Sequence, residues 1–269
     1  MLPALDVRHL AKSYHAGVAG CFASVRVLAD VTLRVRAGEI VGVCGAGGAG
    51  KTTLLLCAAA AVRPDRGEVR WFGVPARADL RRELGVAFVA EFPGQQASLT
   101  ARQSLEHAAA CGAPAVASGD VAGLLDRVGL GRLGGRRVTT LSRGALVRLA
   151  VARALLERPR LLLLDGLLDG LDVRSRSSLA LLLRTVAADD GVACVVGARD
   201  YVTLRGATDR IVTLADGHAA ASRSAVGLGA GGEPWRVASR VAERAETGAW
   251  RRGAQAPARR SVDSPPRAP

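Results

Sequence analysis

The chain has 269 residues, a hydrophobic fraction of 49% and a formal net charge of +13. This length suits one large α/β domain or two small ones, and the apolar content excludes a chain that is disordered throughout. The basic residues are spread along the whole chain rather than clustered, which disfavours nucleic acid as a partner. No apolar run approaches the roughly 18–20 residues of a membrane-spanning helix, and the first ten residues, with Asp6 and Arg8, are not typical of a signal peptide.

From Leu5 to about Leu214, strand-like runs alternate with helix-like runs, which is typical of an α/β domain. Two of the runs, Leu161–Leu164 and Val192–Val196, are almost wholly apolar, as parallel strands covered on both faces should be. We expect strands at Leu5–Leu10, Val27–Val35, Glu39–Cys44, Val69–Phe72, Gly85–Val89, Leu161–Asp165, Ala193–Gly197 and Arg210–Leu214.

One long segment interrupts this alternation. Helical spacing of apolar residues runs through Ser98–Leu133 and is broken at Cys111–Pro114. The sequence therefore predicts a helical insertion, at about residues 95–140, within a domain formed by residues 1–220.

The strand pattern stops after Gly217. Residues 221–269 hold nine arginines against four acidic residues, with Gly- and Pro-rich ends. We expect a basic, largely disordered C-terminal tail. Helical spacing within Trp235–Ala245 leaves an alternative, a short basic amphipathic helix that lies on a membrane or a partner.

The strongest local signal is the run Gly45–Thr53, which matches the phosphate-binding pattern G-x-x-x-x-G-K-[ST] between an expected strand and the helix-like Thr53–Val62. Backbone N–H groups of such a glycine-rich turn, together with a helix N-terminus, attract anions. Lys51 can reach the β- and γ-phosphates of a nucleotide, and the Thr52 hydroxyl can bind Mg²⁺. The predicted nucleotide-binding residues of this loop are Gly45, Gly47, Gly48, Gly50, Lys51, Thr52 and Thr53.

A second element of the phosphate site is predicted where the apolar strand Leu161–Asp165 ends. An acidic residue at such a strand end holds the Mg²⁺ shell in P-loop NTPases. Thr52 and Asp165 are therefore the predicted Mg²⁺ ligands, and the expected cofactors are ATP and Mg²⁺.

Further runs in the same order resemble the nucleotide-binding subunits of ABC (ATP-binding cassette) transporters over roughly residues 4–220. Leu141–Ala145 occupies the position of the family's signature, normally LSGGQ, and Gly170–Asp172 resembles the loop that meets the partner subunit. Tyr14 lies where the family stacks an aromatic ring on adenine. The resemblance implies a P-loop NTPase fold of the α/β class: a mixed, largely parallel sheet flanked by helices, with an antiparallel β subdomain and a helical insertion.

In that family two subunits close head to tail, and each ATP lies between one P-loop and the partner's signature. The resemblance thus implies that Ser142, Arg143 and Gly144 contact ATP held by a second ABC nucleotide-binding subunit, in a homodimer or a heterodimer. It also implies a separate membrane-spanning permease chain as partner. The expected location is cytoplasmic, peripheral on the inner face of the cell membrane.

The sequence departs from the family at residues that do chemistry. The glutamate that polarises the attacking water is replaced by Gly166, and the switch histidine by Arg199, which is a poor proton acceptor. Neither catalytic position is intact. The signature has Arg143 and Ala145 in place of Gly and Gln.

The family's Q-loop glutamine is a further departure. Glu91 stands near its expected position, and Gln95 and Gln96 follow a few residues later. Either glutamine can substitute only if the register of the loop shifts.

These departures leave three hypotheses. The first is an ATP-binding transporter subunit that binds MgATP and hydrolyses it weakly at its own site, because the phosphate cradle is retained and the hydrolytic groups are lost. The second is an ordinary transport ATPase in which Glu91 or Asp169 replaces the missing base. The third is a non-transport ABC protein that uses ATP-driven dimerisation as a switch.

Overall fold

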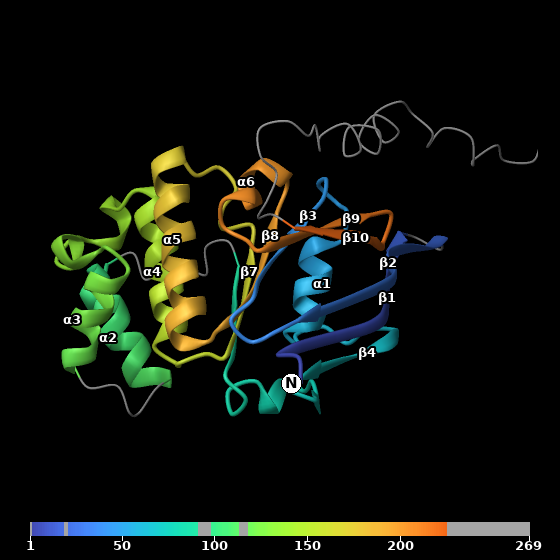
Figure 1. The fold of residues 1–269 in the computed structure, drawn as a ribbon, viewed down its shortest axis with the longest axis horizontal. Coiled ribbons are helices and arrows are strands. Elements are labelled where there is room, and N and C mark those ends of the chain that lie inside the picture. Colours follow the sequence, from blue (N-terminus) through green and yellow to red (C-terminus); the bar gives the residue numbers. More distant parts are fainter. Residues whose placement is uncertain (1, 19–20, 91–97, 113–117, 225–269) are drawn as a thin grey trace, which may run out of the picture. The chain divides into compact units, whose positions relative to one another are not determined.

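The computed structural model of the protein describes residues 2–18, 21–90, 98–112 and 118–224. Their strands form one sheet in the order β5-β4-β1-β2-β10-β9-β3-β8-β7-β6 (Figure 1). One part of the sheet is antiparallel and the other is parallel, and the nucleotide-binding loop belongs to the parallel part.

The parallel part holds five neighbouring strands: β6 (Val86–Val89), β7 (Leu161–Asp165), β8 (Ala193–Ala198), β3 (Ile40–Cys44) and β9 (Arg210–Ala215). The antiparallel part is built from β1 (Leu5–Val18), β2 (Cys21–Val35), β4 (Arg66–Trp71) and β5 (Val74–Pro75). The mixed, largely parallel sheet with an antiparallel β subdomain is as the sequence predicts.

The α-helices are α1 (Lys51–Ala58), α2 (Ala101–Gly112), α3 (Ser118–Arg127), α4 (Arg143–Leu155), α5 (Val173–Asp190) and α6 (Tyr201–Arg205). Short 3-10 turns occupy Ala78–Leu80, Gly131–Leu133 and Val138–Thr140. The helices α2 and α3 form the expected helical insertion. None of the helices in the described residues has the length and apolar character needed to cross a bilayer.

The parallel sheet separates two apolar cores, because alternate residues of a strand face opposite sides. Leu161 and Leu163 of β7 pack in the core that contains α1, whereas Leu162 and Leu164 pack in the core of α2, α4 and α5. All four side chains are fully buried. The apolar run in the sequence therefore reflects a strand that is covered on both faces (Figure 1).

Side-chain caps set the starts of four of the described helices, among them α6, where Asp200 accepts the Thr203 N–H. Thr100 and Gln103 form a reciprocal capping box before α2, with each side chain accepting the other's backbone N–H. Ser142 accepts the Ala145 N–H at the start of α4, and Asp172 accepts the Ser175 N–H at the start of α5.

Three element boundaries differ from the sequence prediction. The strand β1 extends beyond Leu10 and the strand β2 starts before Val27, and the two strands pair as a long hairpin. The helix α1 ends at Ala58 rather than Val62, because Ala60 takes a left-handed φ of 53° and the Ala61 N–H turns back to Leu56 O.

The last described strand overlaps the first residues of the predicted C-terminal tail. The strand β10 (His218–Ser224) continues four residues past the expected boundary at residue 220, held by antiparallel pairing with β9. The remainder of the predicted tail, including Trp235–Ala245, lies outside the described residues.

Candidate nucleotide-binding site

The P-loop runs from the end of β3 at Cys44 to the start of α1 at Lys51, as the motif requires. Its glycines serve the backbone in two ways. Gly48 and Gly50 have left-handed φ values of 82° and 96°, which L side chains rarely adopt. Gly45 passes so close to β9 that an added Cβ would stand 2.4 Å from Leu214 O.

Lys51 folds back over this loop. Its Nζ donates to Gly45 O at 2.6 Å and to Ala46 O at 2.9 Å. Burial lowers the pKa of Lys51 from its ordinary value, while the carboxylates of Asp169 and Asp165 act in the opposite direction. The lysine is thus held at the mouth of the loop, and both carboxylates act on it electrostatically.

The predicted Mg²⁺ ligands stand at the ends of α1 and β7. Thr52 is exposed at the start of α1, whereas its neighbour Thr53 is buried. Asp165 ends β7, and β8 places Gly197 beside it, where an added Cβ would stand 3.1 Å from Asp165 Oδ1. A hydroxyl and a carboxylate are the oxygen ligands that Mg²⁺ prefers, so these residues fit the ion.

Tyr14 lies in β1 and pairs with Val25 of β2 in the long hairpin. The tyrosine residue is 41% exposed. The Lys12 Nζ lies 5.7 Å from the ring centroid and is paired with Asp65 at 2.8 Å. An exposed aromatic ring in this position suits the predicted stacking on adenine.

The sequence predicts that Gly166 and Arg199 replace two catalytic residues, and each directly follows the end of a strand, β7 or β8. Gly166 follows Asp165 directly and has a left-handed φ of 67°. The Arg199 backbone N–H donates to Asp169 Oδ1 at 3.1 Å, and its Nε lies 3.7 Å from Asp169 Oδ2. Gly166 thus offers no side chain next to Asp165, and Arg199 carries a cation paired with Asp169.

The signature residues begin the helix α4. Ser142 and Arg143 are exposed, as a contact with a partner's nucleotide requires. Gly144 is buried, and an added Cβ would stand 2.3 Å from Ser175 Oγ, so this glycine allows α4 and α5 to approach closely. Arg143 Nη2 donates to Asp169 O at 3.1 Å, a contact within the chain that the sequence did not predict.

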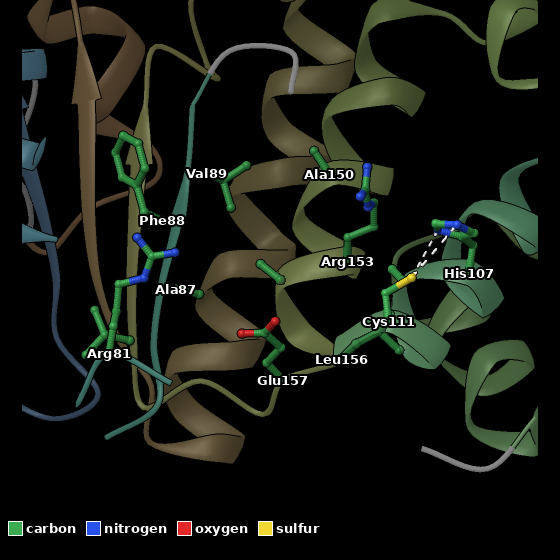
Figure 2. Close-up of a pocket in the computed structure, with 13 residues that line it drawn as sticks. Arg81, Ala87, Phe88, Val89, His107, Cys111, Ala150, Arg153, Leu156 and Glu157 are labelled. Atoms are coloured by element: carbon green, nitrogen blue, oxygen red, sulfur yellow. Dashed lines mark hydrogen bonds between the residues drawn. The ribbon is translucent and has the colours of Figure 1, made fainter. Parts of the chain in front are cut away.

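Glu91, Gln95 and Gln96 lie outside the described residues. The strand that precedes them, β6, borders a pocket of about 360 Å³ that it shares with α2 and α4 (Figure 2). Charged side chains from Arg81, Arg153 and Glu157 line it. None of the predicted site residues lines this pocket. In the described part of the chain no group of three or more His, Cys, Asp or Glu side chains could hold a metal ion.

Comparison with known proteins decides the family. The ABC transporter family model matches residues 28–168. A zinc import ATP-binding protein from Paramagnetospirillum magneticum is 38% identical over 193 residues, which cover 70% of this chain and 68% of that protein. The chain belongs to the ABC transporter family. It is an ATP-binding subunit of the ABC type, which confirms the resemblance seen in the sequence.

Another similar protein and two solved structures support the same family and fold. A lipoprotein-releasing system ATP-binding protein from Shewanella oneidensis is 32% identical over 229 residues, which cover 82% of this chain and 97% of that protein. A dimeric structure of a bacterial ABC transporter cassette has a TM-score of 0.69 and 26% identity, covering 83% of this chain and all of that one. A dimeric cassette structure with bound ADP and phosphate, at 24% identity and a TM-score of 0.71, confirms the fold.

Proposed function

We propose that this ABC subunit binds MgATP at its P-loop and closes as a dimer with a second nucleotide-binding subunit, to drive a separate membrane-spanning permease chain. Hydrolysis at its own site is weak in this proposal. The observation that carries it is the contrast between a complete phosphate cradle, with Lys51 and Asp165 in place, and Gly166, which offers no side chain beside Asp165.

The geometry of the cradle supports MgATP binding. Left-handed glycines and the N-terminus of α1 form an anion-binding turn. Lys51 contacts only backbone carbonyls in its recorded hydrogen bonds, so a phosphate can replace Gly45 O and Ala46 O as its partner. Thr52 and Asp165 would hold Mg²⁺, which neutralises phosphate charge when bound.

The altered catalytic positions support weak hydrolysis. Loss of one general base or water-positioning group typically lowers a rate by about 10²–10⁴. Gly166 cannot orient water, and the Arg199 guanidinium stays protonated and cannot accept a proton. Because effects within one catalytic unit are not additive, the two losses need not multiply.

The relatives support the partners that we propose. Import, export and release systems supply ATP-binding subunits similar to this chain, and solved cassettes of the same fold are dimeric. The exposed signature residues Ser142 and Arg143 would meet the second subunit's nucleotide. We place the subunit in the cytoplasm, peripheral on the inner face of the cell membrane, where it would contact its permease.

Gly166→Glu is expected to raise steady-state ATP turnover at least about tenfold, because it restores a carboxylate next to Asp165. The left-handed φ of 67° at this position strains any L side chain, so the variant should also lose about 1–2 kcal/mol of stability. Phosphate release and thermal unfolding measure the two effects.

Gly166→Gln is the matched control, because it carries the same backbone strain and nearly the same side chain without a carboxylate. It should unfold at the same temperature as Gly166→Glu and show no gain in turnover. Equal turnover in the two variants would mean that the missing carboxylate is not what limits hydrolysis.

A further inference from the structure

Two oppositely charged residues meet at the edge of the sheet where the P-loop lies. The neighbouring parallel strands β7 and β8 end at Asp165 and Ala198, and Asp169 and Arg199 follow these ends. Asp169 Oδ1 accepts the Arg199 backbone N–H at 3.1 Å, and Asp169 Oδ2 lies 3.7 Å from Arg199 Nε. The carboxylate therefore contacts both the backbone and the side chain of this arginine.

The contact uses only one edge of the guanidinium. Asp169 approaches Nε, whereas Nη1 and Nη2 have no recorded partner within the described part of the chain. The Arg199 side chain is 77% exposed, and the Asp169 side chain is 18% exposed. A half-buried carboxylate thus holds the inner end of an arginine whose two terminal nitrogens face solvent.

The backbone on both sides of this pair is fixed. Asp169 N–H donates to Gly166 O at 3.1 Å, and Arg143 Nη2 donates to Asp169 O at the same distance. Next to Arg199, the Asp200 carboxylate caps α6 by accepting the Thr203 N–H at 2.7 Å. The pair is therefore presented from two anchored loops.

Asp169 and Arg199 both act on the P-loop lysine. Burial has the largest effect and lowers the pKa of Lys51, the Asp169 carboxylate raises it, and the Arg199 guanidinium lowers it further. Pairing of β3 with β8 sets Cys44 opposite Ala198, so Arg199 and the P-loop start side by side at this edge of the sheet and border the same space. That space is where the P-loop would hold the phosphates of a nucleotide.

We propose that Asp169 is a positioning residue that presents Arg199 to the terminal phosphate of the bound nucleotide, and that the pair makes this site prefer a triphosphate to a diphosphate. The inference rests on the proposed function, nucleotide binding at the P-loop. Lys51 and the loop amides serve the phosphates that both nucleotides share. A guanidinium placed beyond these groups pairs with the third phosphate of a triphosphate through two N–H groups, whereas a diphosphate has no phosphate at that position.

The carboxylate has two opposing effects on binding. It repels every bound phosphate, which weakens ATP and ADP together. It also holds Arg199 in one conformation, so that less side-chain freedom is lost when the arginine binds. The repulsion acts most on the terminal phosphate, so it opposes the positioning effect in the ratio of the two affinities. A lower ratio in a variant without the carboxylate charge therefore means that the positioning effect is the larger of the two.

The test is calorimetric titration of the full chain with a non-hydrolysable ATP analogue and with ADP, both with Mg²⁺. Asp169→Asn keeps an acceptor for the Arg199 N–H but removes the charge that faces Nε. We expect the preference for the triphosphate to fall about tenfold in Asp169→Asn and in Arg199→Ala. Arg132→Ala, which removes an exposed arginine of the helical insertion, should leave the preference unchanged.

A double variant shows whether Asp169 acts through Arg199. In an Arg199→Ala background, Asp169→Asn should cause no further loss of preference, because the group that it positions is gone. A further loss of the same size would overturn the proposal. An unchanged preference in the single variant would overturn it too, and so would an increased one, since Asp169 would then hold the arginine away from the phosphate.

A failure of the proposed nucleotide binding would give a different result from a failure of this inference. If the unaltered chain binds neither nucleotide, the P-loop assignment is wrong and the inference falls with it. If the unaltered chain binds both nucleotides and only the preference fails to respond, the P-loop assignment stands and the role of Asp169 alone is rejected.

Discussion

Lys51→Ala is expected to weaken MgATP binding by at least about 100-fold. Its Nζ is the cation of the phosphate loop, now engaged with Gly45 O and Ala46 O, and hydrogen bonds to charged groups contribute about 1.5–3 kcal/mol each. Two phosphates lose their charged partner at once. Calorimetric titration of the purified chain with MgATP measures the effect.

The same substitution should leave the fold intact. Burial lowers the pKa of Lys51, and the hydrogen bonds of its Nζ go to two carbonyls of its own loop, so we expect its removal to change the free energy of unfolding little. Arg132→Ala removes an equal charge elsewhere and should bind MgATP as the unaltered chain does. An affinity retained by Lys51→Ala within a few fold would refute the assignment of the phosphate loop.

Gly45→Ala is expected to destabilise the chain by about 2 kcal/mol and to weaken MgATP binding together with stability. The added Cβ would stand 2.4 Å from Leu214 O, which is a backbone atom of β9 that no side-chain rotation can move. Either the loop or the strand has to shift. For a chain of this size, thermal unfolding should fall by about 4–8 °C.

Gly47→Ala is the matched control from the same loop. An added Cβ at Gly47 has no atom within 4 Å, so the unfolding temperature should stay within about 1 °C of the unaltered chain. If Gly45→Ala unfolds at the same temperature as Gly47→Ala, the close approach of the loop to β9 is not present in solution.

The sequence predicts those elements whose conformation is set by their own residues rather than by packing against distant parts of the chain. The four leucines of β7 need cover on both faces and the P-loop carries its own glycines, so both lie where the sequence predicts. The strand β10 has the weak strand sequence of His218–Ser224, and pairing with β9 decides its conformation. The early end of α1 depends on the left-handed Ala60, for which no residue type gives a signal.

The candidate site divides in the same way. The predicted residues of the phosphate cradle are contiguous or stand at a strand end, so the sequence alone can indicate them. The contacts of Asp169 with Arg143 and Arg199 join residues 26 and 30 positions apart. Only the fold brings them together, and the sequence indicated Asp169 merely as a candidate replacement for the missing base.

The most direct test of the whole account is steady-state ATP hydrolysis by the purified chain, with MgATP affinity measured on the same sample. Lys51→Ala sets the background rate. The account predicts MgATP binding that depends on Lys51, together with turnover close to that background. Turnover that depends on Lys51 and reaches an ordinary ATPase rate of about 1 per second or more would contradict weak hydrolysis. A replacement base would then exist at Glu91 or Asp169.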